Sequence, residues 1–213
     1  MRTISAAEHI QQAIAGGEYA PGYKLNESDI ASELGISRNT LRESFAALAE
    51  RGLVTRVPNR GVFISSLTAA DGQEVYTVRS VVEPAALMWG EKLDVDELDR
   101  IVSEAEQALH ADQPKVIADR NQKFHQSIMN SAGSEMMNEK FGDILALMRL
   151  MFLKASCTIP EFHSEYVPVN RSIVTALQDG DRFIATELLR NSLLDTRSKI
   201  IQLLPEEAVY GAQ

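Results

Sequence analysis

The sequence predicts a mostly α-helical protein with three short helices and a β-hairpin in residues 1–66, followed by an all-helical bundle of about six helices. In the first part, glycine and proline turns separate short helical patterns, and two β-branched runs follow them. From residue 71 onward, apolar residues recur every three or four positions and no convincing strand pattern appears. We therefore expect one domain at 1–66, a linker at 67–70 and a second domain at 71–213.

The elements of the first part follow from local signals. Helical spacing of apolar residues predicts helices over 4–14, 26–34 and 37–51. Asn26 and Ser37 are suited to cap the free amides at the start of the second and third helices. The runs LVTRV and GVFIS, joined by PNRG, then predict a β-hairpin.

The second part is divided by turn signals. These fall at 111–114, 131–134, 158–162 and 179–181, between stretches of helical spacing. Apolar runs such as ILALMRLMFL are interrupted by charge and too short to span a bilayer, so we expect no membrane partner. The single cysteine, Cys157, and the lack of an apolar run near the N-terminus favour a cytoplasmic protein.

Charge is distributed unevenly along the chain. The net charge of −9 would, by itself, argue against nucleic acid as a partner. However, residues 1–66 carry seven Lys or Arg and seven Asp or Glu, so the excess acid belongs entirely to the second part. Between Arg38 and Arg60 there are five arginines and only two acids. This local balance favours contact with a phosphate backbone.

The stretch GISRNTLRES indicates how such contact would be made. A glycine turn and a capping serine between two short helices form a helix-turn-helix, whose second helix enters the major groove by its N-terminal end. Arg38 and Arg42 lie four residues apart on one face, while Leu41 and Phe45 have core spacing. The candidate DNA-binding residues of this helix are Ser37, Arg38, Asn39, Thr40 and Arg42.

The hairpin would form a wing beside this helix. Arg60 and Gly61 stand at its tip, and glycine allows the backbone to approach a duplex closely. Taken singly, the helix could be an ordinary solvated amphipathic helix and the hairpin an ordinary surface hairpin. The order of helix, helix, glycine turn, basic helix and basic hairpin favours DNA binding. Double-stranded DNA is therefore the preferred partner, and a protein-binding winged helix is an alternative.

At this point a family resemblance is clear. APGYKLNESDIASELGISRNTLRESFAALAERGLVTRVPNRGVFIS resembles the winged-helix DNA-binding domain of the GntR family of bacterial transcription regulators. The segments VRSVVEPAAL, NQKFHQSI and NRSIVTALQDGDRFIATELL resemble the FCD effector domain of its FadR subfamily. The resemblance implies a homodimeric regulator, by default a repressor and not an enzyme, that answers to an organic or sugar acid. It assigns operator contacts to Arg38, Thr40, Arg42, Arg60 and Gly61, but Ser28 replaces an arginine that the family often has.

The resemblance to FCD domains implies a possible metal site, because many of these domains hold a metal with one carboxylate and three histidines. The corresponding positions here are Asn121, His125, Asn170 and Ser192. Amide and hydroxyl oxygens are weak ligands for Zn²⁺ or Ni²⁺, so we expect no cofactor, and any metal would use His125 with Asn121. The four residues are instead candidates for hydrogen bonds to an effector. A metal-dependent enzyme or metal sensor is the alternative, although no HExxH or nucleophile–base motif is present.

Two arginines in apolar surroundings are further effector candidates. Arg79 lies within VYTVRSVVEPAAL and Arg149 within ILALMRLMFL. A buried guanidinium requires an anion, which could be an internal partner such as Glu83 or the carboxylate of an effector. Both possibilities stay open from the sequence.

Overall fold

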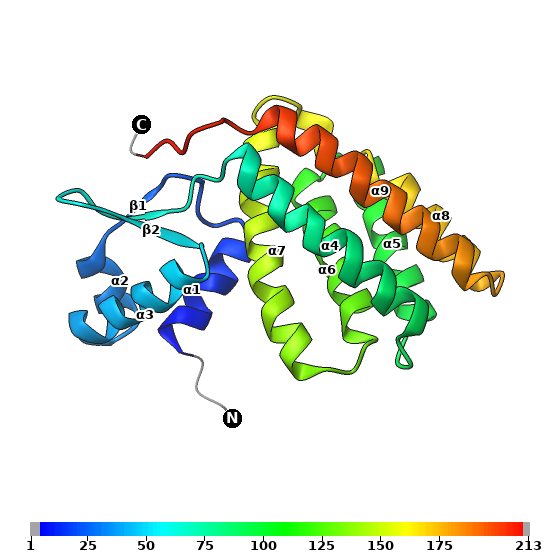
Figure 1. Ribbon diagram of the computed structural model, residues 1–213, viewed down its shortest axis with the longest axis horizontal. Coiled ribbons are helices and arrows are strands. Elements are labelled where there is room, and N and C mark those ends of the chain that lie inside the picture. Colours follow the sequence, from blue (N-terminus) through cyan, green and yellow to red (C-terminus); the bar gives the residue numbers. More distant parts are fainter. Residues whose placement is uncertain (1–4, 211–213) are drawn as a thin grey trace.

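The computed structural model describes residues 5–210, apart from the side chain of residue 160. The N-terminal part contains α1 (Ala6–Ala15), β1 (Lys24–Leu25), α2 (Glu27–Glu33), α3 (Arg38–Glu50), β2 (Val54–Val57) and β3 (Gly61–Ile64) (Figure 1). The three expected helices and the hairpin are confirmed, while Ile4, the first residue of the expected pattern, lies outside the described residues. The short strand β1 was not predicted. It pairs with β3 and completes a sheet of order β1-β3-β2.

Side-chain caps explain where these helices begin. The Asn26 side chain accepts a hydrogen bond from the backbone of Ser28 at 3.0 Å, and Ser37 accepts one from Thr40 at 3.1 Å. Both predicted caps are therefore present. Leu41 and Phe45 are fully buried, as their spacing predicted, so the opposite side of α3 is left for solvent or DNA.

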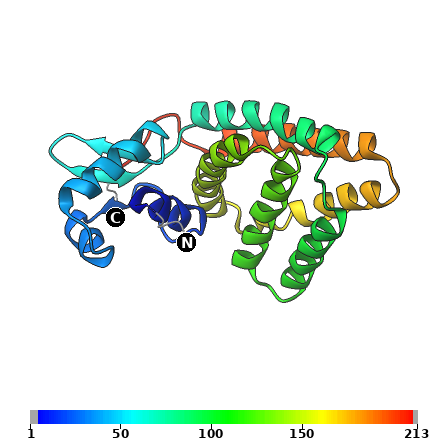
Figure 2. The same cartoon turned by 90° about the horizontal axis from the view of Figure 1, so that it is seen from below.

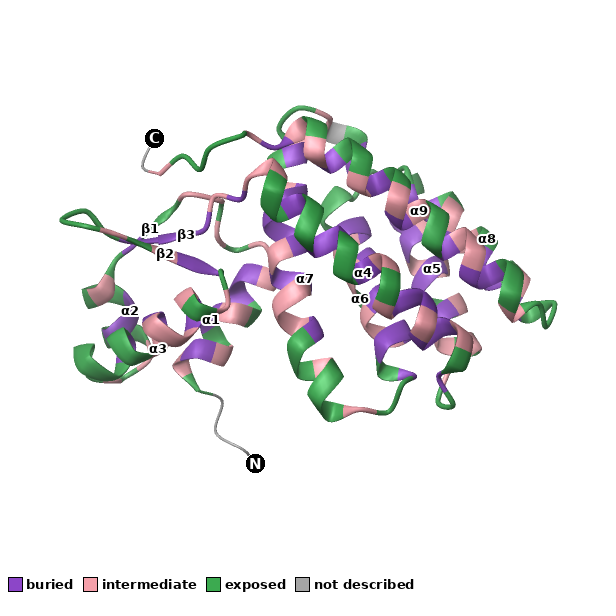
Figure 3. Cartoon of the chain, in the orientation of Figure 1, coloured by how far each residue is buried: buried purple, intermediate pink, exposed green. Residues whose placement is uncertain are grey.

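The C-terminal part is an all-helical bundle. Its helices are α4 (Ala69–Trp89), α5 (Val95–His110), α6 (Pro114–Asn130), α7 (Glu135–Ser156), α8 (Tyr166–Gln178) and α9 (Arg182–Leu203), with a 3-10 turn at Pro160–His163. The expected six helices are confirmed. Long helices α4 and α9 pack antiparallel along one side, and buried residues line the helix faces that meet inside the bundle (Figures 1 and 3). No helix within residues 5–210 has the length and apolarity needed to cross a membrane.

The two parts contact each other through α1 and α7, which lie side by side in two views (Figures 1 and 2). At this contact the side-chain amide of Gln11 donates to Asp143 at 2.9 Å. Arg51, at the end of α3, lies 3.6 Å from the same carboxylate. Burial raises the pKa of Asp143, and the neighbouring Arg51 opposes that rise. A polar cluster therefore joins the end of α3 to the bundle.

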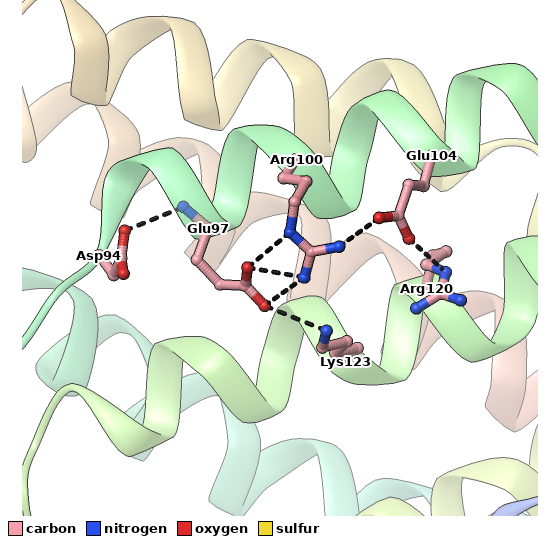
Figure 4. Close-up of polar contacts among 6 residues, drawn as sticks. All are labelled: Asp94, Glu97, Arg100, Glu104, Arg120 and Lys123. Carbon is pink, nitrogen blue, oxygen red and sulfur yellow. Dashed lines mark hydrogen bonds and ion pairs between the residues drawn. The ribbon is translucent and has the colours of Figure 1, made fainter.

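Charged side chains on α5 and α6 pair with each other on the surface of the bundle. Arg100 binds Glu97 and Glu104, while Arg120 reaches Glu104 at 3.0 Å and Lys123 reaches Glu97 at 3.1 Å (Figure 4). Such exposed pairs contribute little stability individually. Their relevance here is electrostatic, because the basic residues of this surface are neutralised by the bundle's own acids.

Candidate nucleic-acid interface and effector site

The polar residues at the start of α3 form an exposed surface. Every residue of α3 and its cap named as a DNA contact is exposed, namely Ser37, Arg38, Asn39, Thr40 and Arg42. The positions of Arg38 and Arg42 are set by contacts with α2. Nη2 of Arg38 donates to the Ser28 hydroxyl at 2.9 Å, and Nε of Arg42 donates to Glu27 at 3.1 Å. The two arginines are thus held at the exposed junction of the helix-turn-helix.

Ser28 has a role that the family comparison did not anticipate. The resemblance to the family implied an arginine at this position, so the serine was expected to remove one DNA contact. In the structure its hydroxyl accepts a hydrogen bond from Arg38. Ser28 therefore supplies no positive charge itself but helps to orient the guanidinium of Arg38.

The wing lies next to this junction. Arg60 and Gly61 are exposed, and Gly61 has φ +112°, a backbone conformation that favours glycine. A groove of about 530 Å³ connects them to Lys24, Asn26 and Glu27 at the start of α2. Because Glu27 in turn binds Arg42, the wing tip and the recognition helix belong to one continuous surface.

Two basic residues of this surface were missed as site residues. Lys24, on β1, lines the groove beside the wing. Arg56, on β2, donates from Nη2 to the backbone carbonyl of Arg42 at 2.7 Å, which links the hairpin directly to α3. The excess of arginine in this region already included Arg56, but only the fold shows that it approaches the recognition helix.

The bundle encloses a cluster of buried charged groups. Nε of Arg79 lies 2.5 Å from Glu83 within α4, and Nδ1 of His125 on α6 lies 2.5 Å from the other oxygen of the same carboxylate. Burial raises the pKa of Glu83, but Arg79 and His125 outweigh it and hold the carboxyl below its ordinary pKa. Of the two partners considered for Arg79, the internal one is therefore present.

Several donors of this buried region are poorly satisfied. Within the described residues, Nδ1 of His163 has no hydrogen-bond partner. In the same part of the chain, Nη2 of Arg79 and the hydroxyls of Tyr76 and Tyr166 make no well-aligned hydrogen bond, although Tyr76 interacts with the Arg79 guanidinium and Tyr166 with Thr196. Buried polar atoms without partners carry a free-energy cost unless a ligand or water satisfies them. Tyr76, Tyr166 and His163 were not identified from the sequence, where each appears as an ordinary helix or loop residue.

The four positions of the family metal pattern make different contacts in the structure. Asn170 donates to Asn121 at 3.0 Å, and both line a nearly closed cavity of about 10 Å³ with His163. His125 pairs with Glu83, and Ser192 is not among the residues that line this cavity. The assignment of all four residues to one effector therefore stays a prediction.

These positions also do not provide ligands for a transition metal. Asn170 and Asn121 are hydrogen-bonded to each other, and His125 is the one imidazole among the four residues. Within residues 5–210 no three His, Cys, Asp or Glu side chains are placed to hold a metal ion. Zn²⁺ and Ni²⁺ favour imidazole and thiolate ligands, so the residues present do not fit such a metal.

Arg149 lies at the boundary between the two parts of the chain. Its Nη2 donates to Asp119 at 2.9 Å and lies 3.4 Å from the carbonyl oxygen of Gly16 at the end of α1. Among the described residues, Nε and Nη1 of this buried guanidinium have no partner. The sequence suggested an effector contact for Arg149, and the structure places it against the N-terminal part.

Comparison with known proteins agrees with this architecture. Residues 3–64 match the model for bacterial regulatory proteins of the gntR family, and residues 74–195 match the FCD domain. A GntR protein of known structure from Rhodococcus sp. RHA1 is 30% identical, with a TM-score of 0.82, and the match covers 92% of this chain and 95% of the other. The chain belongs to the GntR family. Its FCD domain is consistent with the FadR subfamily.

The curated relatives include transcriptional regulators of the helix-turn-helix type. The uncharacterized HTH-type transcriptional regulator YdhC of Bacillus subtilis (strain 168) is 29% identical over 67% of each chain. The HTH-type transcriptional repressor GlaR of Escherichia coli (strain K12) is 26% identical over 91% of this chain and 92% of its own. This GntR-family chain is therefore similar to regulators along almost its entire length.

Proposed function

We propose that this GntR-family protein is a cytoplasmic, homodimeric repressor that binds double-stranded operator DNA and responds to a small carboxylate. Residues 1–66 act as the DNA-binding domain, 67–70 as the linker and 71–213 as the effector and dimerisation domain. The proposed operator contacts are Ser37, Arg38, Asn39, Thr40, Arg42, Arg60 and Gly61. Similarity to the repressor GlaR supports repression as the direction of control.

One observation carries the DNA-binding proposal. Arg38 and Arg42 at the exposed start of α3 are linked through the start of α2 and a groove to the wing tip at Arg60. Helix-turn-helix proteins present the first residues of the recognition helix to base edges and use neighbouring cations on phosphates. A basic surface with this arrangement fits one half-site of a duplex.

The dimer follows from the small size of that surface. One recognition helix reads only a few base pairs, and a two-fold dimer reads two half-sites. Helix α4 has an exposed apolar face at Val78, Val81 and Trp89, with exposed fractions of 43%, 66% and 75%. We place the contact with the second copy on this face, because burial of apolar surface drives such association.

For the effector we propose the buried interior of the FCD domain. Nη2 of Arg79 is a buried cationic donor without a well-aligned hydrogen-bond partner among the described residues, and guanidinium groups match carboxylates well. The Asn121–Asn170 pair and His125 would adjust their hydrogen bonds around the same ligand. Arg149 on α7 and Ser192 on α9 would affect effector binding indirectly, because the positions of these two helices shape the interior of the domain. The cavity of about 10 Å³ requires the helices to separate when a ligand enters.

A mobility-shift experiment tests the DNA-binding proposal. The DNA is the region upstream of the protein's own gene, titrated with protein between 50 and 200 mM salt. We expect Arg38→Ala and Arg42→Ala each to weaken binding by about 10-fold or more, the size of one good base or phosphate contact. The matched control is Arg100→Ala, which removes an equally exposed arginine from α5 (Figure 4). Equal effects of all three substitutions, or binding that does not depend on salt, would refute the assignment.

The same assay tests the effector. A panel of organic and sugar acids is added to the protein–DNA complex, and a true effector should change operator affinity about 5–150-fold. The double variant Arg79→Gln/Glu83→Gln removes both buried charges without leaving either unpaired. It should still bind the operator but no longer respond to the acid. A normal response in this variant would exclude Arg79 as the carboxylate contact.

A further inference from the structure

The segment that follows α9 leaves the bundle (Figures 1 and 2). After α9 the segment 205–210 returns to the N-terminal domain, as both ribbon views show (Figures 1 and 2). The carbonyl of Pro205 accepts a hydrogen bond from the backbone of Ala69 at 2.9 Å, and the backbone of Val209 donates to the Ser66 hydroxyl at 3.3 Å. The segment therefore runs beside the linker between the two domains. We call it the C-terminal strap.

Tyr210, near the end of the strap, is anchored on the wing sheet. Its hydroxyl lies 2.9 Å from the hydroxyl of Thr55 on β2, and its ring centroid lies 5.9 Å from that of Phe63 on β3. Thr55 and Phe63 are direct partners in the sheet register. Side chains at these two positions share one face of the sheet, so Tyr210 covers both.

This contact explains the burial of Phe63. Its neighbours Val62 and Ile64 belong to the helix-facing core, and alternation along the strand directs Phe63 to the other face. Yet Phe63 is only 2% exposed. The strap, with the guanidinium of Arg60 at 5.5 Å from the ring centroid, provides the cover on that face.

The strap also holds the wing arginine. Nη2 of Arg60 donates to the backbone carbonyl of Tyr210 at 2.9 Å. The remaining guanidinium nitrogens have no hydrogen-bond partner in the part of the chain that the structure describes, and the residue is exposed. Arg60 is thus fixed by one nitrogen and by its stacking on Phe63, with the others available to a phosphate.

The turn before β1 is shaped to admit the strap. Gly22 has φ +76°, and a Cβ at this position would lie 2.9 Å from the carbonyl oxygen of Val209. At the other end, Gly72 of α4 allows close approach, since a Cβ there would lie 2.9 Å from Ile200 of α9. The strap is therefore packed tightly where it meets the N-terminal domain, and the helix from which it leaves is packed tightly against α4.

We infer that the C-terminal strap is a working part of the DNA-binding domain, with Tyr210 positioning Arg60 for contact with operator phosphate. This inference rests on the proposed DNA-binding function. It adds to the operator interface a segment that lies far from the helix-turn-helix in sequence. Because the strap begins at the end of α9 and contacts the wing sheet, it also gives the bundle a second, non-covalent connection to the wing, beside the covalent linker.

The test compares two shortened chains in the salt-titrated mobility-shift assay. A chain that ends at Gly211 keeps the strap and leaves the Tyr210 carbonyl in an amide, and a chain that ends at Pro205 loses the strap beyond that residue but keeps the bond to Ala69. We expect the first to bind like the full chain. The second should bind about 5- to 10-fold more weakly, and its salt slope should fall by about 1, as for one lost phosphate contact.

Arg60→Ala is then introduced into the full chain and into the chain that ends at Pro205. If the strap acts through Arg60, the substitution weakens the full chain but changes the shortened one little, because the two losses are not additive. Tyr210→Ala and Tyr210→Phe repeat the test without a truncation. The alanine variant should resemble the shortened chain and the phenylalanine variant should resemble the full chain, with folding checked by circular dichroism.

Unchanged or tighter binding by the chain that ends at Pro205, or a full Arg60→Ala loss in both backgrounds, would overturn the role of the strap alone. If the shortened chain unfolds, the same criteria apply to the Tyr210 variants. Failure of the full chain to bind the upstream DNA at any salt would instead count against the proposed function, and this inference would fall with it.

Discussion

Nη2 of Arg149, a buried cation of the helical bundle, lies 3.4 Å from the carbonyl oxygen of Gly16 at the end of α1 in the DNA-binding domain. Gly17 leaves room for this contact, because a Cβ at that position would lie 2.6 Å from Nε of the same guanidinium. The connection between the domains thus depends on a residue without a side chain.

Substitution of Gly17 tests this connection, and Gly180 supplies a matched control. Both glycines have positive φ, +74° and +81°, but nothing lies within 4 Å of a Cβ at Gly180. We expect Gly180→Ala to cost about 1 kcal/mol from backbone strain, and Gly17→Ala about 2–4 kcal/mol because Arg149 is also displaced. Urea unfolding of the two variants measures the difference. Equal losses would show that the Arg149 contact contributes nothing.

A carboxylate within the proposed DNA interface should limit affinity. Glu27 binds Arg42 at 3.1 Å, so a phosphate must compete with it for the guanidinium. We expect Glu27→Gln to tighten operator binding about 2- to 5-fold, the range of an exposed ion pair. Glu33→Gln removes the same charge from the exposed end of α2 and is the control. Comparable gains from both would mean that net charge matters and the Arg42 pair does not.

The buried pair Arg79–Glu83 should behave differently from surface pairs. Glu83→Ala leaves the Arg79 cation buried without its partner, and we expect a loss of about 3–5 kcal/mol in unfolding free energy. Glu97→Ala, which breaks the exposed pair with Arg100, should cost at most about 1 kcal/mol. The double variant Arg79→Met/Glu83→Met should recover most of the loss, since no charge remains unpaired. A double variant as unstable as Glu83→Ala would contradict this account.

His163 should make stability depend on pH. Burial, and secondarily the charge of Arg149, lowers the pKa of His163 from 6.5 to about 4. Between pH 4 and 6.5, His163 is therefore protonated in the unfolded chain and neutral in the folded chain. Stability is complete above about pH 6.5 and falls as the pH drops toward 4, by up to about 3 kcal/mol from this residue. In His163→Gln this part of the pH dependence should vanish, whereas exposed His9→Gln should retain it; identical profiles would refute the assignment.

The proposed dimer can be broken at its exposed apolar face. Val81 on α4 is 66% exposed, and Met136 at the start of α7 is 75% exposed. We expect Val81→Asp to yield monomers and to weaken operator binding, because a buried unpaired charge opposes association. Met136→Asp should remain dimeric. Light scattering after gel filtration reports both masses, and a dimeric Val81→Asp would move the interface elsewhere.

The parts of the structure that were predictable depend on local chemistry. Ser37 and Asn26 were recognised as caps because a cap involves residues two or three positions apart. The Arg79–Glu83 pair could be suggested from its helical spacing for the same reason. Strand β1 could not, since it has only two residues and exists through its pairing with β3.

What escaped prediction depends on distant parts of the chain. His125 was assigned to a ligand cluster, but its partner Glu83 lies 42 positions away on another helix. Arg149 appeared to be an arginine of the bundle interior, and only the packing of α1 on α7 places it at Gly16. The contact of Tyr210 with Thr55 spans 155 positions, and nothing in the local pattern of either residue indicates it.

The nearly closed cavity beside Asn121 and Asn170 has a consequence for timing. With a volume of only about 10 Å³, it cannot admit an organic acid until the surrounding helices move apart. The rate of effector association should therefore level off as the acid concentration rises, at the rate of that opening. With such a slow opening step, operator binding would change when the acid is present for a long time and would change little during a brief rise in its concentration.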